Sequence, residues 1–139
     1  MKLEVGMYVR TNNGIKQIYR IDNNKTKYKY LFKLKKQDGD GCIDCGVLSS
    51  EDILKASHTL LGNDKEPCLI EPGDYVNGKL VVYIYDIYTS DNIFIGKYLY
   101  EDDKSLIGGE EDIKSIVTRE QFEAMTYKVV EEWIKYVLH

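Results

Sequence analysis

The chain has 139 residues, of which 43% are hydrophobic and 30% charged, and two are prolines. This length fits one domain or two very small ones, and the composition excludes a disordered chain because apolar residues suffice for a packed core. No apolar run approaches the roughly 18 residues of a membrane helix, and the amino terminus lacks the apolar region of a signal peptide. We therefore expect a cytoplasmic location.

The net charge of −4 hides an uneven distribution. Residues 1–36 contain ten lysines and arginines against two acids, a net charge of +8, and the remaining residues carry −12. Such a chain can present a basic and an acidic patch to different partners, or dock head to tail with a copy of itself. The alternative is that opposite charges neutralise one another within the fold.

The first predicted elements form a hairpin. A glycine-containing turn leads into a short strand at 8–11, and the loop "NNG" at 12–14 separates it from a strand centred on Ile18. Asparagine and glycine between apolar runs are a strong hairpin signal. The pattern therefore predicts two antiparallel strands here.

The next strand is predicted at 25–36, "KTKYKYLFKLKK", where lysines alternate with aromatic and aliphatic residues. Successive strand side chains point to opposite faces, so one face would be basic. The other face would turn four side chains toward the core, namely Tyr28, Tyr30, Phe32 and Leu34. Lysines about 6.6–6.8 Å apart match the phosphate repeat of a nucleic acid. Rings that stack on bases would have to share the face of the lysines, but the tyrosines lie on the opposite face. The row is therefore expected to contact phosphates and not to read bases.

This basic row has two interpretations. It is a surface for binding anions or nucleic acid, widened by arginines on neighbouring strands, or it is a solvated face whose lysines guard an edge strand against aggregation. The candidate binding residues are Arg10, Arg20, Lys25, Lys27, Lys29, Lys33 and Lys35.

The second half of the chain repeats the first at an offset of 66 or 67 residues. The aligned pairs are Gly6 with Gly73, Tyr8 with Tyr75, Val9 with Val76, and Ile18 with Ile84. The repeat predicts a mainly β (α+β) fold of two tandem small SH3-like β-modules that arose by internal duplication, each a strongly bent sheet or small barrel. The expected parts are a first module at 1–61, a linker at 62–71, a second module at 72–117 and a C-terminal helical segment at 118–139.

A capping box predicts where the C-terminal helix begins. Gln121 follows Thr118 by three residues, and apolar residues then recur at helical spacing. The stripe consists of Phe122, Met125, Val129, Trp133 and Val137. It would pack either on the modules or against a second copy in a homodimer. The candidates for self-association are Val129, Trp133 and Val137.

Few residues suggest chemistry. Cys42 and Cys45 form a CxxC pair, with Cys68 and His58 as candidate further ligands, but no second pair completes a zinc site. The acidic runs at 101–103 and 110–112 are expected to be solvated tips. The sequence shows no nucleophile–base arrangement and no P-loop. We therefore expect no enzymatic activity, no metal and no cofactor.

Three stretches carry a resemblance to other proteins. They are "GMYVRTNNGIKQI" near the start, "PGDYVNG" at 72–78 and "IKSIVTREQFEAMTYKV" at 113–129. Together they resemble a family of small proteins encoded by phages and prophages of clostridial-type bacteria. This chain departs from the family pattern at Met7, where aspartate is usual, and in its extension from 130 to 139. The resemblance implies an accessory phage protein in the cytoplasm of an infected bacterium, and it transfers no functional residue.

Small acidic accessory proteins of phages often inhibit host defence by binding. The leading hypothesis is a counter-defence inhibitor that blocks a CRISPR effector or another immune complex, or sequesters an immune nucleotide signal. One alternative is a nucleic-acid-binding accessory module that uses residues 25–36. Another is a structural or assembly protein of the virion. The expected partner is thus a host defence protein or immune nucleotide, with nucleic acid as the alternative and no membrane.

Overall fold

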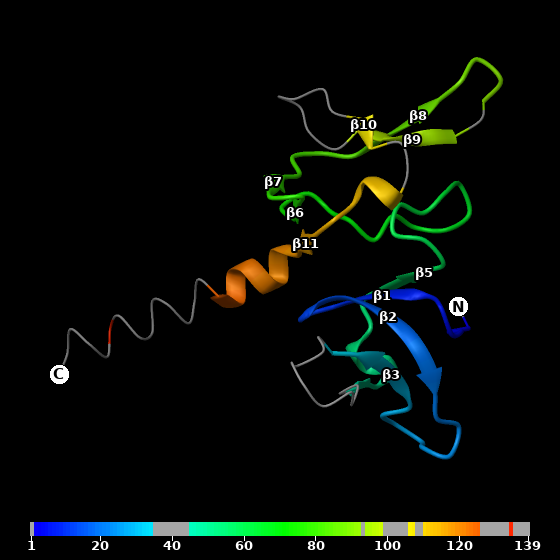
Figure 1. Cartoon of the computed structure of the whole chain (residues 1–139), viewed down its shortest axis with the longest axis vertical. Helices are drawn as coiled ribbons and strands as arrows, with labels where there is room; N and C mark the ends of the chain where they lie inside the picture. Colours follow the sequence, from blue (N-terminus) through cyan, green and yellow to red (C-terminus); the bar gives the residue numbers. More distant parts are fainter. Residues whose placement is uncertain are drawn as a thin grey trace. The chain divides into compact units, whose positions relative to one another are not determined.

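The computed structural model describes residues 2–34, 45–92, 94–98, 106–107, 110–125 and 134. The chain is mainly β, with a short helix toward its C-terminal end, and it divides into two compact units, Met1–Leu69 and Ile70–His139 (Figure 1). Most of the expected linker at 62–71 lies in the first unit. There the Asn63 N–H donates to the Glu66 carbonyl at 2.9 Å, and the Leu69 N–H donates to the Leu60 carbonyl at 3.0 Å.

The first unit contains one five-stranded antiparallel sheet. Its strands are β1 (Tyr8–Thr11), β2 (Gly14–Ile21), β3 (Tyr30–Lys33), β4 (Cys45–Leu48) and β5 (Lys55–Ser57). They lie side by side in the order β4-β3-β2-β1-β5, and the 3-10 turn η1 (Ser50–Asp52) precedes β5. No pairing among the described strands joins β4 to β5, so the sheet is open. Of the two forms expected for the module, a strongly bent sheet or a small barrel, the barrel is therefore wrong.

The hairpin of β1 and β2 confirms the signal in the sequence. Thr11 lies opposite Gly14, whose φ of +105° favours a residue without a side chain. The Thr11 hydroxyl donates to the Gly14 carbonyl at 2.9 Å and fixes the turn. A bulge between Ile18 and Arg20 then bends the long strand β2, which allows it to pair with β1 along one part and with β3 along the other.

The core of the first unit lies on one face of this sheet. Its buried residues are Val9, Ile18, Tyr30 and Leu48. Partly buried hydrophobic residues pack around them, namely Leu3, Ile21, Phe32, Ile53 and Ala56. Every strand of the sheet therefore contributes to one cluster, as expected for strands with an apolar face.

The strand predicted at 25–36 is wrong in its extent. Only Tyr30–Lys33 is strand, residues 25–29 belong to the connection between β2 and β3, and 35–36 lie outside the described residues. A turn at Asp22 explains why the strand begins only at Tyr30. The Asp22 carboxylate accepts the Asn24 N–H at 3.1 Å, and the Asp22 carbonyl accepts the Lys25 N–H at the same distance. This local turn interrupts the pairing that the alternating pattern predicted.

The second unit contains two three-stranded antiparallel sheets. The strands are β6 (Tyr75–Val76), β7 (Lys79–Leu80), β8 (Tyr85–Tyr88), β9 (Phe94–Tyr98), β10 (Leu106–Ile107) and β11 (Ile116–Val117). Their orders are β11-β6-β7 and β10-β9-β8, and the 3-10 turn η2 (Glu110–Asp112) precedes β11. A helical segment at 119–125 follows.

Matching backbone hydrogen bonds occur at the start of both units. They are Gly6 N–H to Ile18 O and Ile18 N–H to Met7 O in the first unit, and Gly73 N–H to Val81 O and Val81 N–H to Asp74 O in the second. Val81 therefore takes the position of Ile18, and both side chains are buried. The expected pairing of Ile18 with Ile84 is wrong because the second hairpin has shorter strands. Its turn is as long as the first one, since Val76 lies opposite Lys79 as Thr11 lies opposite Gly14, but each strand is two residues shorter.

The capping box at the start of the helical segment is confirmed. The Thr118 N–H donates to the Gln121 side chain at 3.0 Å, and the Gln121 N–H donates to the Thr118 hydroxyl at 3.3 Å. Beyond the cap, Phe122 and Met125 are 47% and 61% exposed. The self-association candidates Val129, Trp133 and Val137 lie outside the described residues. Within the part of the chain that the structure describes, no helix is long and apolar enough to cross a membrane.

Candidate anion-binding site

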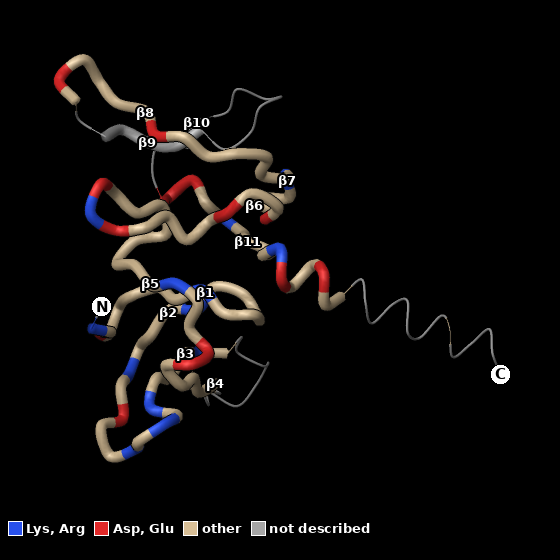
Figure 2. The backbone as a smooth tube through the Cα atoms, turned by 180° about the vertical axis from the view of Figure 1, so that it is seen from behind, with Lys and Arg blue, Asp and Glu red and all other residues tan. Residues whose placement is uncertain are grey.

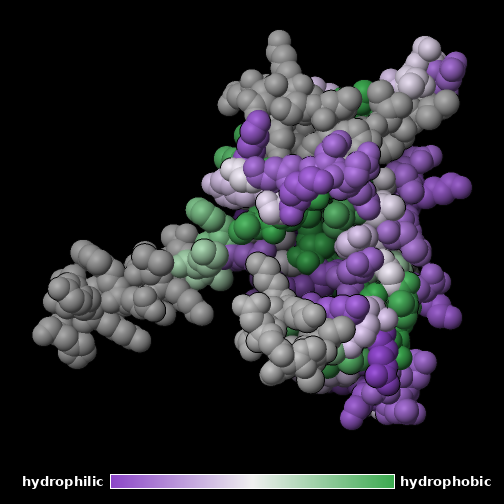
Figure 3. Space-filling model, in the orientation of Figure 1, coloured by the Kyte–Doolittle hydropathy of each residue, from purple (hydrophilic) through white to green (hydrophobic). Residues whose placement is uncertain are grey.

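Basic side chains gather on one hairpin of the first unit. We call β2, β3 and their connection at 22–29 the basic hairpin. Figure 2 shows its lysines and arginine along the lower end of that unit, and Figure 3 shows a hydrophilic surface around the same connection. The structure places five of the seven predicted binding residues here, namely Arg20, Lys25, Lys27, Lys29 and Lys33. All are exposed except Lys29, which is half-buried.

Arg10 does not belong to this surface. It lies on β1, next to β2 as expected, but its side chain is fully buried and its Nη1 donates to the Leu69 carbonyl at 2.9 Å. The chain passes back over β1 at Leu69 and covers the Arg10 side chain. The sequence pattern did not indicate this contact. The remaining predicted residue, Lys35, lies outside the described residues.

Lysines and aromatic rings are interleaved on the basic hairpin. Four ammonium groups lie 5.1–5.5 Å from the centroid of a ring, within the range of cation–π attraction. The pairs are Lys16 with Phe32, Lys27 with Tyr28, Lys29 with Tyr30, and Lys33 with Tyr19.

The expected segregation of lysines from aromatics is therefore wrong. Of the four residues assigned to the core, Tyr30 is buried and Phe32 is half-buried, but Tyr28 and Leu34 are 51% and 45% exposed. Tyr28 lies in the β2–β3 connection, before the strand begins, so strand alternation does not direct it inward. An exposed ring beside lysines can stack on a flat ligand while the lysines hold a phosphate.

A cleft of about 660 Å³ lies between the basic hairpin and the N-terminal segment. Residues 2–5 line one side of it, and Ile21, Asn23, Lys29 and Tyr30 line the hairpin side, with Ser50 beside them. Its volume is in the range of small-ligand sites, roughly 300–1,000 Å³. The lining includes two lysines, Lys2 and Lys29, and one acidic residue, Glu4.

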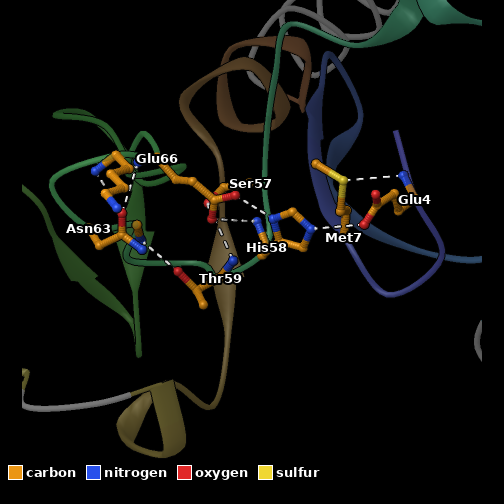
Figure 4. Close-up of polar contacts among 9 residues, drawn as sticks. Glu4, Met7, Ser57, His58, Thr59, Asn63 and Glu66 are labelled. Atoms are coloured by element: carbon orange, nitrogen blue, oxygen red, sulfur yellow. Dashed lines mark hydrogen bonds and ion pairs between the residues drawn. The ribbon is translucent and has the colours of Figure 1, made fainter. Parts of the chain in front are cut away.

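A histidine clamp holds the N-terminal side of this cleft (Figure 4). The His58 Nε2 lies 3.2 Å from the Glu4 carboxylate, and its Nδ1 contacts the Glu66 carboxylate. The Glu66 carboxylate also accepts the His58 N–H at 3.1 Å and the Ser57 hydroxyl at 3.2 Å. His58 thus links the segment after β5 to the N-terminal segment and offsets the charge of Glu4.

The clamp favours a charged imidazole. Hydrogen bonds from His58 to Glu66 and then to Glu4 raise the pKa of His58 above its ordinary value of 6.5. The hydrogen bond to His58 lowers the pKa of Glu66 below its ordinary value of 4.5. Because carboxylates occupy both ring nitrogens and Ser57 donates to Glu66, the arrangement is an ion-pair network in which His58 does not activate the Ser57 hydroxyl.

The cysteines do not come together in the described structure. Cys45 is exposed on β4, where its sulfur lies 2.6 Å from the Tyr19 hydroxyl, and this hydrogen bond raises the pKa of Tyr19 above 10.0. Cys68 lies in the loop that returns along the first unit, and Cys42 is outside the described residues. Among the described residues, no three histidine, cysteine or carboxylate side chains form a group that could hold a metal ion.

The two units differ in net charge. The first contains twelve lysines and arginines against nine acids, a net charge of +3, and the second contains seven against fourteen, a net charge of −7. An anionic ligand is therefore attracted to the first unit and repelled by the second.

Sequence reasoning found most of the basic hairpin but missed the cleft and the clamp. His58 and Glu4 are 54 positions apart, and no motif connects them. Comparison with known proteins adds no candidate, because no family, curated protein or solved structure matches this chain.

Proposed function

We propose that this protein is a non-catalytic accessory binding protein whose first unit binds phosphate-bearing ligands through the basic hairpin. The observation that carries the proposal is the set of four lysine–aromatic pairs on that hairpin. Lysines supply contacts to phosphate, and the exposed ring of Tyr28 supplies a stacking surface. The net charge of +3 on the first unit has the sign that such a ligand requires.

The position of β3 weakens the alternative that its lysines only guard an edge. Lysines protect strands whose backbone groups lack a partner strand. β3 lies between β2 and β4, so both of its sides are paired. Protection of a sheet edge against aggregation therefore does not explain why a lysine occupies position 33.

Counter-defence is the biological role that we propose for this binding. A protein that holds phosphates can sequester an immune nucleotide signal or occupy the nucleic-acid path of a CRISPR effector. The resemblance to phage and prophage proteins supports this context, as does the scarcity of catalytic groups in the sequence. Pull-down from a host lysate, with nucleotide analysis and mass spectrometry of the eluate, distinguishes capture of a nucleotide from capture of an immune complex or a virion protein.

Salt-dependent binding tests the proposed function directly. Fluorescence anisotropy with labelled single-stranded DNA, RNA and duplex DNA would be measured over a series of salt concentrations. Three or four phosphate contacts predict a slope of log K against log salt of about −2 to −3 for a single strand. The triple variant Lys27→Gln, Lys29→Gln, Lys33→Gln should lose most of the affinity and most of the slope.

Lys65→Gln is the matched control. Lys65 is also an exposed lysine of the first unit, but it lies in the loop after β5 and not on the basic hairpin. This variant should bind like the original protein. Binding that is unaffected by the triple variant, or that does not change with salt, would remove the hairpin from the proposal.

We also propose that the two units are SH3-like copies of one duplicated module. The matching elements support this. In both units a hairpin comes first, a 3-10 turn precedes the last strand, and that strand pairs with the first one. The registers agree as well, since Tyr8 lies opposite Ser57 and Tyr75 lies opposite Val117.

An experimental structure of the whole chain tests the duplication. Superposing the two units should place Tyr75 on Tyr8 and Val81 on Ile18, with the two 3-10 turns on each other. A different order of strands around β9 and β10 would contradict a common origin, even if the first hairpins still matched.

A further inference from the structure

We infer that the cleft between the N-terminal segment and the basic hairpin is a binding site for a nucleoside phosphate. This inference rests on the proposed function, because it assigns a ligand class and a specific location to the phosphate binding of the first unit. The open face of the hairpin suits an extended strand, whereas the cleft is enclosed by two segments and suits one small ligand.

The charges in the cleft select an anion. Lys2 of the N-terminal segment and Lys29 of the basic hairpin both line it, and the Lys29 ammonium lies 5.5 Å from the ring centroid of Tyr30, another lining residue. Glu4 is the one carboxylate among the lining residues, and its charge is offset by His58, whose Nε2 lies 3.2 Å away. The cleft is therefore positive toward a ligand, and a phosphate group can contact lysines on both walls.

The other lining residues select a nucleoside over free phosphate. Leu3, Val5 and Ile21 provide apolar surface, and Val5 is 59% exposed, so its side chain is available to a ligand. The amide of Asn23 and the hydroxyl of Ser50 are donors and acceptors that suit the edge of a base or a ribose hydroxyl. These lining residues match a ligand with an anionic group at one end and a flat, partly apolar body at the other. A nucleoside phosphate has this form.

Calorimetric titration of the full chain tests this assignment. The probes are adenosine monophosphate, a cyclic dinucleotide, adenosine and inorganic phosphate. We expect the two nucleotides to bind, and adenosine and phosphate each to bind at least about tenfold more weakly, because each lacks half of the contacts.

Two variants separate the cleft from the open face of the hairpin. Lys2→Gln removes a charge that only the cleft uses, and Val5→Trp fills the cleft from an exposed position that leaves the core intact. Each should weaken nucleotide binding about tenfold or more. Lys65→Gln is the control, since Lys65 is an exposed lysine of the first unit that neither lines the cleft nor lies on the hairpin. Circular dichroism verifies that each variant is folded.

The outcomes distinguish this inference from the proposed function. Loss of nucleotide binding in Lys2→Gln and Val5→Trp, with Lys65→Gln unchanged, supports the cleft. If nucleotides bind but Val5→Trp has no effect, the site lies elsewhere and the inference is wrong. If labelled oligonucleotides bind and nucleotides do not, the cleft is wrong and the hairpin proposal stands. If neither class of ligand binds, both fail.

Discussion

Arg10 is a charged side chain with no exposed surface, and its Nη1 donates to the Leu69 carbonyl at 2.9 Å. Replacing it with methionine keeps most of the packing volume and removes the hydrogen bond to a buried carbonyl. We predict that Arg10→Met lowers the free energy of unfolding by about 1.5–3 kcal/mol. The measurement is urea unfolding followed by circular dichroism.

Arg20→Met is the control for that change. Arg20 lies on the neighbouring strand and is exposed, so its replacement should change the free energy of unfolding by less than about 0.5 kcal/mol. Equal effects of the two substitutions would show that the buried hydrogen bond of Arg10 contributes nothing to the free energy of unfolding.

The clamp at His58 makes a second prediction, which concerns pH. The pKa of His58 is raised in the folded chain, so its contribution to stability is full below about pH 6.5 and disappears as the pH rises through the folded value. The pKa of Glu66 is lowered, so its contribution is present above about pH 4.5 and disappears as the pH falls through its folded value. The clamp therefore stabilises the fold most between these limits.

His58→Gln tests this prediction. The difference in urea midpoint between the original protein and the variant should be largest near pH 5.5–6.5 and should shrink at alkaline pH, about 9–10. Glutamine keeps hydrogen-bonding groups but cannot carry the charge. A difference that stays constant across the whole pH range would mean that the ion pairs contribute nothing.

At the scale of the element, the helical segment at 119–125 depends on its first residues. The Thr118 hydroxyl accepts the Gln121 N–H, and Asp74 accepts the Arg119 N–H at 2.8 Å, so two backbone groups without helical partners are satisfied. We predict that Thr118→Ala costs about 1 kcal/mol of stability. Thr118→Ser keeps the oxygen and should cost clearly less. The urea midpoints of the two variants provide the comparison, and equal losses would assign the effect to the buried methyl group.

The basic hairpin shows how local turn chemistry limits a strand. Alternation predicted strand from 25 to 36, but the turn at Asp22 keeps residues up to Lys29 out of the sheet. As a result Tyr28 is exposed beside Lys27 instead of buried opposite it. The surface that this creates differs from the predicted row of lysines, because an exposed ring lies beside an ammonium group.

At the scale of the whole molecule, self-association stays a prediction from the sequence. In the sequence Val129, Trp133 and Val137 recur at helical spacing, and Phe122 and Met125, which precede them, are largely exposed. We predict that the intact chain is a dimer and that a chain ending at Val129 is a monomer. Light scattering after size-exclusion chromatography measures both.

Trp133→Ala provides a milder test of the same stripe. As a central anchor of a dimer, Trp133 should contribute about 2 kcal/mol or more to association. The substitution should therefore raise the dimer dissociation constant by more than about tenfold. If the intact chain is a monomer and the truncated chain is merely less stable, the stripe packs within its own chain and the dimer is wrong.

Short-range patterns in the sequence determined the mainly β class, the first hairpin and the start of the helix. Each of these depends on residues a few positions apart, such as the "NNG" turn or the pair Thr118 and Gln121. Backbone preferences and capping act over such distances whatever the rest of the chain does, so the pattern is sufficient.

Only the tertiary structure decided which charges are exposed and where the cleft lies. Arg10 is buried by Leu69, which is 59 positions away, and Glu4 meets His58 across 54 positions. Nothing in the local sequence of Arg10 distinguishes it from Arg20, since both lie on strands next to apolar residues. The difference arises because the chain returns over one face of the sheet and leaves the basic hairpin uncovered, and long-range packing of that kind has no periodic signal.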